Sequence, residues 1–149
     1  MRDQFPAALK EAMKAGDKPR VAAVRLIEAA LKSREIELRG EGRTIADSDV
    51  MAVLQKMVKS RRESLEIYVK AGREDLAAVE RSEIAVIETF LPKALGAAEI
   101  DAAIREAIAA VGATGIKDMG KVVAALKAKF AGQMDLGAVS GKVKAALGA

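Results

Sequence analysis

The sequence contains no cysteine, no histidine and no tryptophan, and its only aromatic residues are three phenylalanines and one tyrosine. Without cysteine there is neither a disulfide framework nor a thiolate nucleophile. Without histidine the chain lacks the most common general base and metal ligand, and zinc sites built from cysteine and histidine are excluded. A site made of carboxylates alone stays open, but no motif for one is present. We therefore expect no catalytic residue, no metal and no cofactor.

Long apolar segments are also missing. The apolar runs are far shorter than the ~20 residues that a helix needs to span a bilayer. Residues 1–16 carry acidic side chains among their apolar ones and have no continuous apolar core, so they do not resemble a signal peptide. These absences predict a cytoplasmic protein without a membrane partner.

Helix-forming residues dominate what is present, with 12 glycines and three prolines, and no alternating apolar pattern is long enough for a strand. The periodicity predicts an all-α fold, with helices at residues 2–15, 18–39, 47–71, 75–90, 98–111, 117–130 and after Asp135. Pro92 disfavours the α conformation at Leu91 and ends the fourth helix. We expect an N-terminal four-helix bundle-like domain, residues 1–94, followed by a small three-helix C-terminal domain, residues 95–149.

Apolar faces and caps complete the expected fold. The predicted buried faces are Phe5, Leu9, Ala12 and Met13 in the first helix, Val24, Ile27, Leu31 and Leu38 in the second, and Leu76, Val79, Ile84, Ile87 and Phe90 or Leu91 in the fourth. Asp17 and Asp47 are expected to cap the second and third helices, and Asp135 the seventh. Most glycines are expected to end helices.

Positive charge is concentrated at the C-terminal end. The net charge is +4, but residues 1–111 hold 19 basic and 19 acidic side chains. Residues 112–149 hold six lysines against two aspartates, so the whole excess lies there. A localised basic region predicts an anionic partner such as RNA, DNA or a lipid surface. The alternative is an ordinary lysine-rich helix exterior in contact with solvent.

One short motif in this region invites a nucleotide-binding interpretation. Gly115, Gly120 and Lys121 match the phosphate-loop pattern G-x-x-x-x-G-K-[ST], but Val122 stands where a hydroxyl is required to hold magnesium. The preceding residues are helical in pattern, whereas a phosphate loop follows a strand. A helix cap followed by an amphipathic helix is the better interpretation.

Short segments spread over nearly the whole chain carry a family likeness. They are VRLI at residues 24–27, KSRRES at 59–64, AGREDL at 71–76, FLP at 90–92, VGAT at 111–114 and DMGKV at 118–122. In this order and spacing they resemble the YqeY family, the free-standing relatives of the tail domain of GatB, a subunit of the glutamine-dependent tRNA amidotransferase. The resemblance implies an all-helical protein of two domains that contacts tRNA, while the catalytic parts of the amidotransferase lie elsewhere.

Two positions depart from the family pattern. The segment Ala131-Gly132-Gln133 stands where Lys-Gly-Lys/Arg is common, and Ala94 stands where a glutamine usually follows Leu-Pro. The first departure removes charge from a loop that would otherwise be expected to bind phosphate.

The charge and the resemblance together predict a monomeric accessory protein that binds tRNA or another structured RNA and has no catalytic centre of its own. Binding would rest on phosphate contacts, because almost no aromatic side chain is available for base stacking. The expected RNA-binding residues are Lys117, Lys121, Lys127, Lys129, Lys142, Lys144, Arg25, Lys59, Arg61 and Arg62. Backbone amides at the start of the sixth helix are expected to assist.

Two alternatives stay open. The chain could be a protein-interaction module that docks on another protein subunit through its basic face. It could also be a carbon–nitrogen ligase with glutamine as amido-N-donor, an activity that the family resemblance carries. The available groups would be Ser60, Ser64 and Tyr68 near Lys56 and Lys59. A serine and a lysine four or five residues apart on a helix are ordinary surface chemistry without a desolvated lysine and an oxyanion hole, so we expect no catalysis by this chain alone.

Overall fold

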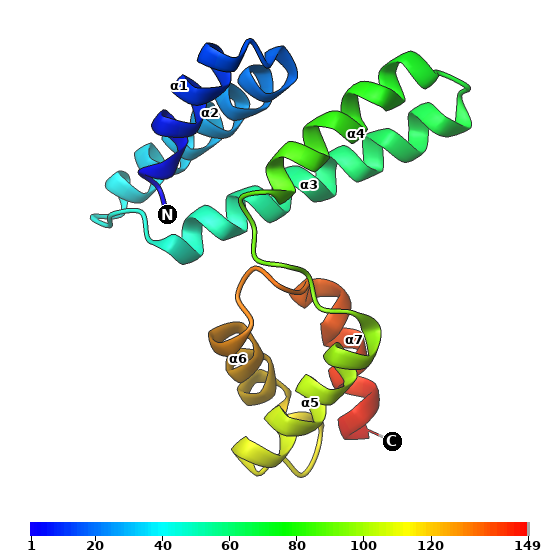
Figure 1. Ribbon diagram of the computed structural model, residues 1–149. Coiled ribbons are helices and arrows are strands. Elements are labelled where there is room, and N and C mark those ends of the chain that lie inside the picture. Colours follow the sequence, from blue (N-terminus) through cyan, green and yellow to red (C-terminus); the bar gives the residue numbers. More distant parts are fainter. Residues whose placement is uncertain (149) are drawn as a thin grey trace. The chain divides into compact units, whose positions relative to one another are not determined.

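The computed structural model describes residues 1–148. Over this range the chain forms seven α-helices and one turn of 3₁₀ helix and no strand (Figure 1). In chain order these are α1 (Gln4–Ala15), α2 (Lys18–Gly40), α3 (Asp47–Lys70), α4 (Glu74–Glu88), α5 (Ala97–Val111), η1 (Ile116–Asp118), α6 (Met119–Lys129) and α7 (Leu136–Gly148). The expected all-α class is confirmed.

The helices form two compact units, Met1–Leu91 and Pro92–Ala149. The first unit holds α1 to α4, and the second holds α5, η1, α6 and α7. Each unit has its own cluster of buried apolar side chains. None of the helices described over residues 1–148 is both long and apolar enough to cross a membrane.

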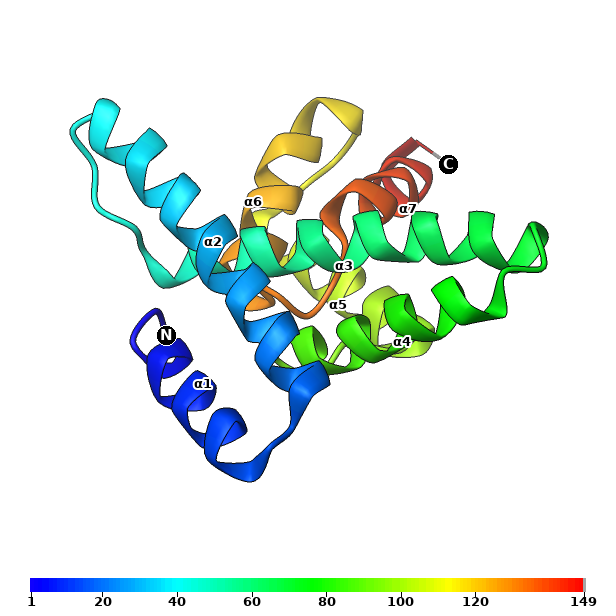
Figure 2. The same ribbon diagram turned by 90° about the horizontal axis from the view of Figure 1, so that it is seen from above.

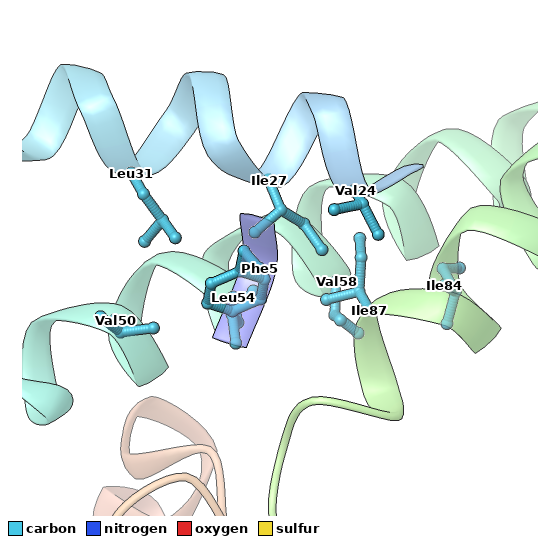
Figure 3. Packing of buried hydrophobic residues seen from close by; sticks show 9 residues of the cluster. All are labelled: Phe5, Val24, Ile27, Leu31, Val50, Leu54, Val58, Ile84 and Ile87. Atoms are coloured by element: carbon cyan, nitrogen blue, oxygen red, sulfur yellow. The ribbon is translucent and has the colours of Figure 1, made fainter. Parts of the chain in front are cut away.

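Two helical hairpins make up the first unit, with α1 beside α2 and α3 beside α4 (Figures 1 and 2). Apolar side chains from all four helices meet where α2 crosses α3 (Figure 3). The buried set is Phe5, Val24, Ile27, Leu31, Val50, Leu54, Val58, Ile84 and Ile87. Burying one such side chain contributes about 1.5–3 kcal/mol relative to leaving it exposed, so this cluster holds the two hairpins together.

Two apolar residues that the periodicity placed in the core are exposed instead. The side chain of Met13 in α1 is 55% exposed and that of Val79 in α4 is 53% exposed. The smaller Ala8 and Ala77 are buried in these helices. Alanine lets neighbouring helices approach closely, so the contact faces of α1 and α4 are rotated away from the larger side chains.

The caps of the first unit agree with expectation at α2 and differ at α3. Asp17 caps α2, because its Oδ1 accepts a hydrogen bond from the N–H of Arg20 at 3.1 Å. The N-cap of α3 is Ala46, not Asp47, which is already helical. Asp49 reaches back and accepts the N–H of Ala46 at 3.0 Å. This bond is the largest cause of the lowered pKa of Asp49.

In the second unit three helices pack around a separate core. Its buried members are Ala103, Ile104, Ala107, Val122, Leu126, Met134, Val139 and Val143. Asp135 caps α7 as expected and accepts the N–H of Gly137 at 2.9 Å. Gly120, Gly137 and Gly141 lie within α6 and α7, inside the ranges expected for these helices.

The loop between α6 and α7 holds the segment that precedes α5. The backbone O of Gln133 accepts the N–H of Leu95 at 2.8 Å. The side-chain Nε2 of Gln133 donates to the backbone O of Lys93 at 3.4 Å. The uncharged Gln133 therefore has a structural role inside the second unit.

Candidate nucleic-acid interface

The six lysines that follow residue 111 all occupy exposed positions of the second unit. Lys117 lies in η1, Lys121, Lys127 and Lys129 lie in α6, and Lys142 and Lys144 lie in α7. The unit as a whole holds eight basic and five acidic side chains. Its net charge is therefore +3, because α5 adds more acidic side chains than basic ones.

Two of these lysines face carboxylates of α5. The Nζ of Lys129 lies 3.4 Å from Glu106, and the Nζ of Lys142 lies 3.5 Å from Asp101. All four side chains are about half exposed or more. Exposed ion pairs contribute only ~0–1 kcal/mol and are screened by salt. The carboxylates therefore lower the local potential but leave both lysines able to change partners.

A third carboxylate stands at the start of α6. Asp118 accepts the backbone N–H of Thr114 at 3.0 Å and its hydroxyl at 3.4 Å. The Thr114 N–H is the largest cause of the lowered pKa of Asp118; partial burial opposes it, and Lys121 and Lys117 assist it. The Nζ of Lys121 lies 3.9 Å from the same carboxylate. The carboxylate of Asp118 therefore offsets positive charge at the start of α6, although it accepts no backbone N–H of α6 itself.

Lys127 and Lys144 are in a different situation. Side chains two residues apart on an α-helix point about 160° away from each other. Lys129 and Lys142 face α5, so Lys127 and Lys144 point away from it. Neither makes an ion pair with any residue in the range 1–148. Lys117 of η1 likewise forms no salt bridge within that range, so three of the six lysines after residue 111 are unpaired there.

The expected residues of the first unit behave differently from one another. Arg25 and Lys59 are exposed on α2 and α3, without an ion pair among the described residues. Arg62 pairs with Glu88 at the surface. Arg61 is only 19% exposed, and it contacts the carboxylates of two glutamates of α4, Glu80 and Glu83. Arg61 thus helps to hold α3 on α4, and its expected contact with RNA stays a prediction.

A groove that the sequence did not predict lies in the first unit, between α2 and α3 with Glu80 of α4 at its edge. It encloses about 660 Å³. Its lining is Ala30, Ser33, Arg34, Glu37, Asp49, Ala52, Val53, Lys56, Met57, Ser60, Arg61, Ser64 and Glu80. Lys56, Ser60 and Ser64 are spaced four residues apart along α3, and this spacing was the only sign in the sequence of the α3 wall of the groove. The α2 wall could not be foreseen, because it depends on how α2 crosses α3.

These features define a small all-α protein with two helical units, of which the second carries most of the net positive charge. The chain belongs to the YqeY family. The family model described as "Yqey-like protein" matches residues 2–147. The resemblance seen in the short segments is therefore confirmed over almost the whole chain.

Curated relatives share the name "Altered inheritance of mitochondria protein 41, mitochondrial". The relative from Lachancea thermotolerans is 32% identical over 98 residues, which are 64% of this chain and 51% of that protein. The relative from Saccharomyces cerevisiae (strain YJM789) is 28% identical over 93 residues, 62% of this chain and 49% of that protein. The chain spans about half the length of both. The relative from Pyrenophora tritici-repentis is 29% identical over 150 residues, 98% of this chain and 80% of that protein.

These relatives correct the expected cytoplasmic location. They are named as mitochondrial proteins, which points to the mitochondrion and not to the cytoplasm. The expectation rested on the missing cysteines and the missing long apolar runs. A chain without disulfides fits any reducing compartment, so these features do not distinguish the interior of an organelle from the cytoplasm.

Proposed function

We propose that this protein binds structured RNA, and tRNA in particular, through its second unit. The observation that carries the proposal is the set of three exposed lysines, Lys117, Lys127 and Lys144, that no ion pair within residues 1–148 neutralises, in a unit of net charge +3. The resemblance to the GatB tail domain supports tRNA as the RNA. Phosphate contacts by lysine give affinity and position without reading sequence.

The remaining three lysines can also contact RNA phosphates, because their carboxylate partners are weakly bound. Lys121, Lys129 and Lys142 are 74%, 67% and 48% exposed, and each faces one carboxylate at 3.4 Å or more. Replacing such a weak partner by a phosphate costs little, because exposed ion pairs are worth at most about 1 kcal/mol. The surface can therefore engage more phosphates than its unpaired lysines alone.

Titration of labelled deacylated tRNA with the full chain, at several salt concentrations, tests the proposal. The double variant Lys127→Gln/Lys144→Gln removes two unpaired lysines. The matched control Lys10→Gln/Lys14→Gln removes the same charge from exposed positions of α1. Each phosphate contact on duplex RNA or DNA contributes roughly 0.9 to the slope of log affinity against log salt. We expect the first variant to lower the slope by about 1.8 and the control to leave it unchanged.

Two results would count against RNA binding by this unit. One is an affinity for tRNA no tighter than ordinary non-specific binding. The other is an equal loss of affinity in the two double variants, which would show that only total charge matters.

A further inference from the structure

We propose that the groove between α2 and α3 binds a small organic anion, a carboxylate or phosphate ester that carries a short apolar carbon chain. The groove encloses about 660 Å³, and sites for small molecules typically measure about 300–1,000 Å³. It lies in the first unit, whereas the lysines proposed to bind RNA lie in the second. Either proposal can therefore fail without the other.

The acidic groups on the walls of the groove already have partners. Glu37 and Asp49 lie 2.9 Å and 3.6 Å from the guanidinium of Arg34. Glu80 lies 3.4 Å from Arg61. Each carboxylate of the lining is thus already in contact with an arginine, and Lys56 brings the formal charge of the lining to zero.

The hydrogen-bond donors on the walls of the groove, in contrast, lack partners among the described residues. The side-chain hydroxyls of Ser33 of α2 and of Ser60 and Ser64 of α3 make no hydrogen bond to another residue of the range 1–148, and Lys56 makes no ion pair there. The Nε of Arg61 is buried and has no acceptor among the same residues. Because Lys56, Ser60 and Ser64 are four residues apart, they line one side of α3.

The ammonium group of Lys56 and the three serine hydroxyls are donors without an acceptor in the described part of the chain. A negatively charged acceptor would bind them best, because charge-assisted hydrogen bonds are stronger than neutral ones. The rest of the lining is apolar and comes from Ala30, Ala52, Val53 and Met57. This part of the groove fits a hydrocarbon segment. A head group with negative oxygens and a short carbon chain matches both parts.

Methyl NMR of the full chain, labelled at methionine, valine and alanine, provides the test. Butyrate and butyl phosphate are titrated separately, with neutral butyramide as the control ligand. We expect saturable shifts of the Val53 and Met57 methyl signals with at least one anion and none with butyramide. The anion that saturates at lower concentration identifies the head group.

Two variants distinguish binding in this groove from a general effect of positive charge. Lys56→Gln should weaken the binding about tenfold or more, because a hydrogen bond to a charged group is worth about 1.5–3 kcal/mol. Lys32→Gln, at an exposed position of α2 outside the groove, should leave it unchanged. Both substitutions are at the surface, and the methyl spectrum confirms that each variant is folded. Shifts that do not saturate with either anion, that are equal with butyramide, or that persist unchanged in Lys56→Gln would overturn the proposal.

Discussion

Phe5, in the first turn of α1, and Phe90, two residues beyond α4, contact each other with ring centroids 4.9 Å apart and planes inclined by 50°. The guanidinium of Arg20 lies 5.1 Å from the centroid of the Phe90 ring. Phe5 is fully buried. The first and last parts of the first unit are thus joined by one aromatic pair, and the stability of this unit depends strongly on it.

Replacing Phe5 by alanine should destabilise the first unit by about 3–5 kcal/mol, the usual cost of deleting a buried phenylalanine ring. Urea unfolding followed by the fluorescence of Tyr68 measures this, because it is the only tyrosine and lies in α3. Met13→Ala, at a position 55% exposed, should change stability by no more than about 0.5 kcal/mol. Similar losses in the two variants would contradict the described core.

Adjacent arginines of α3 should differ in their contribution to stability. Arg61→Gln leaves Glu80 and Glu83, each only 15% exposed, without a guanidinium, and should cost about 1–3 kcal/mol. Arg62→Gln breaks a surface pair with Glu88 and should cost less than about 1 kcal/mol. Tyr68 fluorescence in urea again gives both values. If Arg61→Gln proves no more harmful than Arg62→Gln, the assignment of Arg61 to helix packing is wrong.

The lowered pKa of Asp118 makes the second unit sensitive to acid. A carboxylate whose pKa is lower in the folded state adds stability above its unfolded pKa, ordinarily about 3.9, and that stability is lost as the pH falls through the folded pKa. Asp118→Asn should therefore destabilise the unit near neutral pH and make little difference at strongly acidic pH. Urea titrations at a series of pH values, read from the methyl signals of Val122 and Val143, measure the difference. A penalty that stays constant down to strongly acidic pH would contradict this role of the charge.

The same substitution should improve RNA binding. Without the carboxylate of Asp118, Lys121 loses its partner and can contact phosphate, so we expect tighter binding of tRNA and a salt slope steeper by up to about 0.9. Asp3→Asn removes one negative charge from an exposed position near α1 and serves as the control. Equal gains in the two variants would mean that the effect comes from net charge and not from the start of α6.

Replacement by alanine should change the stability of the second unit in opposite directions at Gly141 and at Gly112. Gly141 lies inside α7, and a Cβ there would meet nothing within 4 Å, so Gly141→Ala should stabilise the unit by about 0.5–1 kcal/mol. Gly112 ends α5 with φ of 65°, and alanine in this left-handed conformation should cost about 1–2 kcal/mol. Thermal unfolding of both variants, read from the methyl signals of the second unit, decides the signs.

Sequence periodicity predicts those parts of the fold that depend on one helix at a time. Val24, Ile27 and Leu31 of α2 were expected on one face and are fully buried. Periodicity fails where small residues compete with large ones. Ala8 is buried while Met13 is exposed, because the closeness of two helices is a property of the pair and not of either sequence.

The candidate sites show the same limit. The concentration of lysine after residue 111 was visible in the sequence, but the α5 carboxylates that face it were not. Glu106 is 23 residues from Lys129, and Asp101 is 41 residues from Lys142. Arg61 was expected to contact RNA, whereas in the structure it pairs with Glu80 and Glu83 of α4. Charges can be counted along a chain, but their partners are set by tertiary packing.

The hydrogen bonds of Gln133 bear on the length of the connection between the two units. The first unit extends to Leu91, and the second unit already holds the backbone of Lys93. The free connector is therefore far shorter than the non-helical stretch between α4 and α5. A very short tether keeps the local concentration of one binding module near another high. A partner that engages both units would gain avidity from this connection, and inserting a flexible segment after Leu91 would reduce that gain without altering either site.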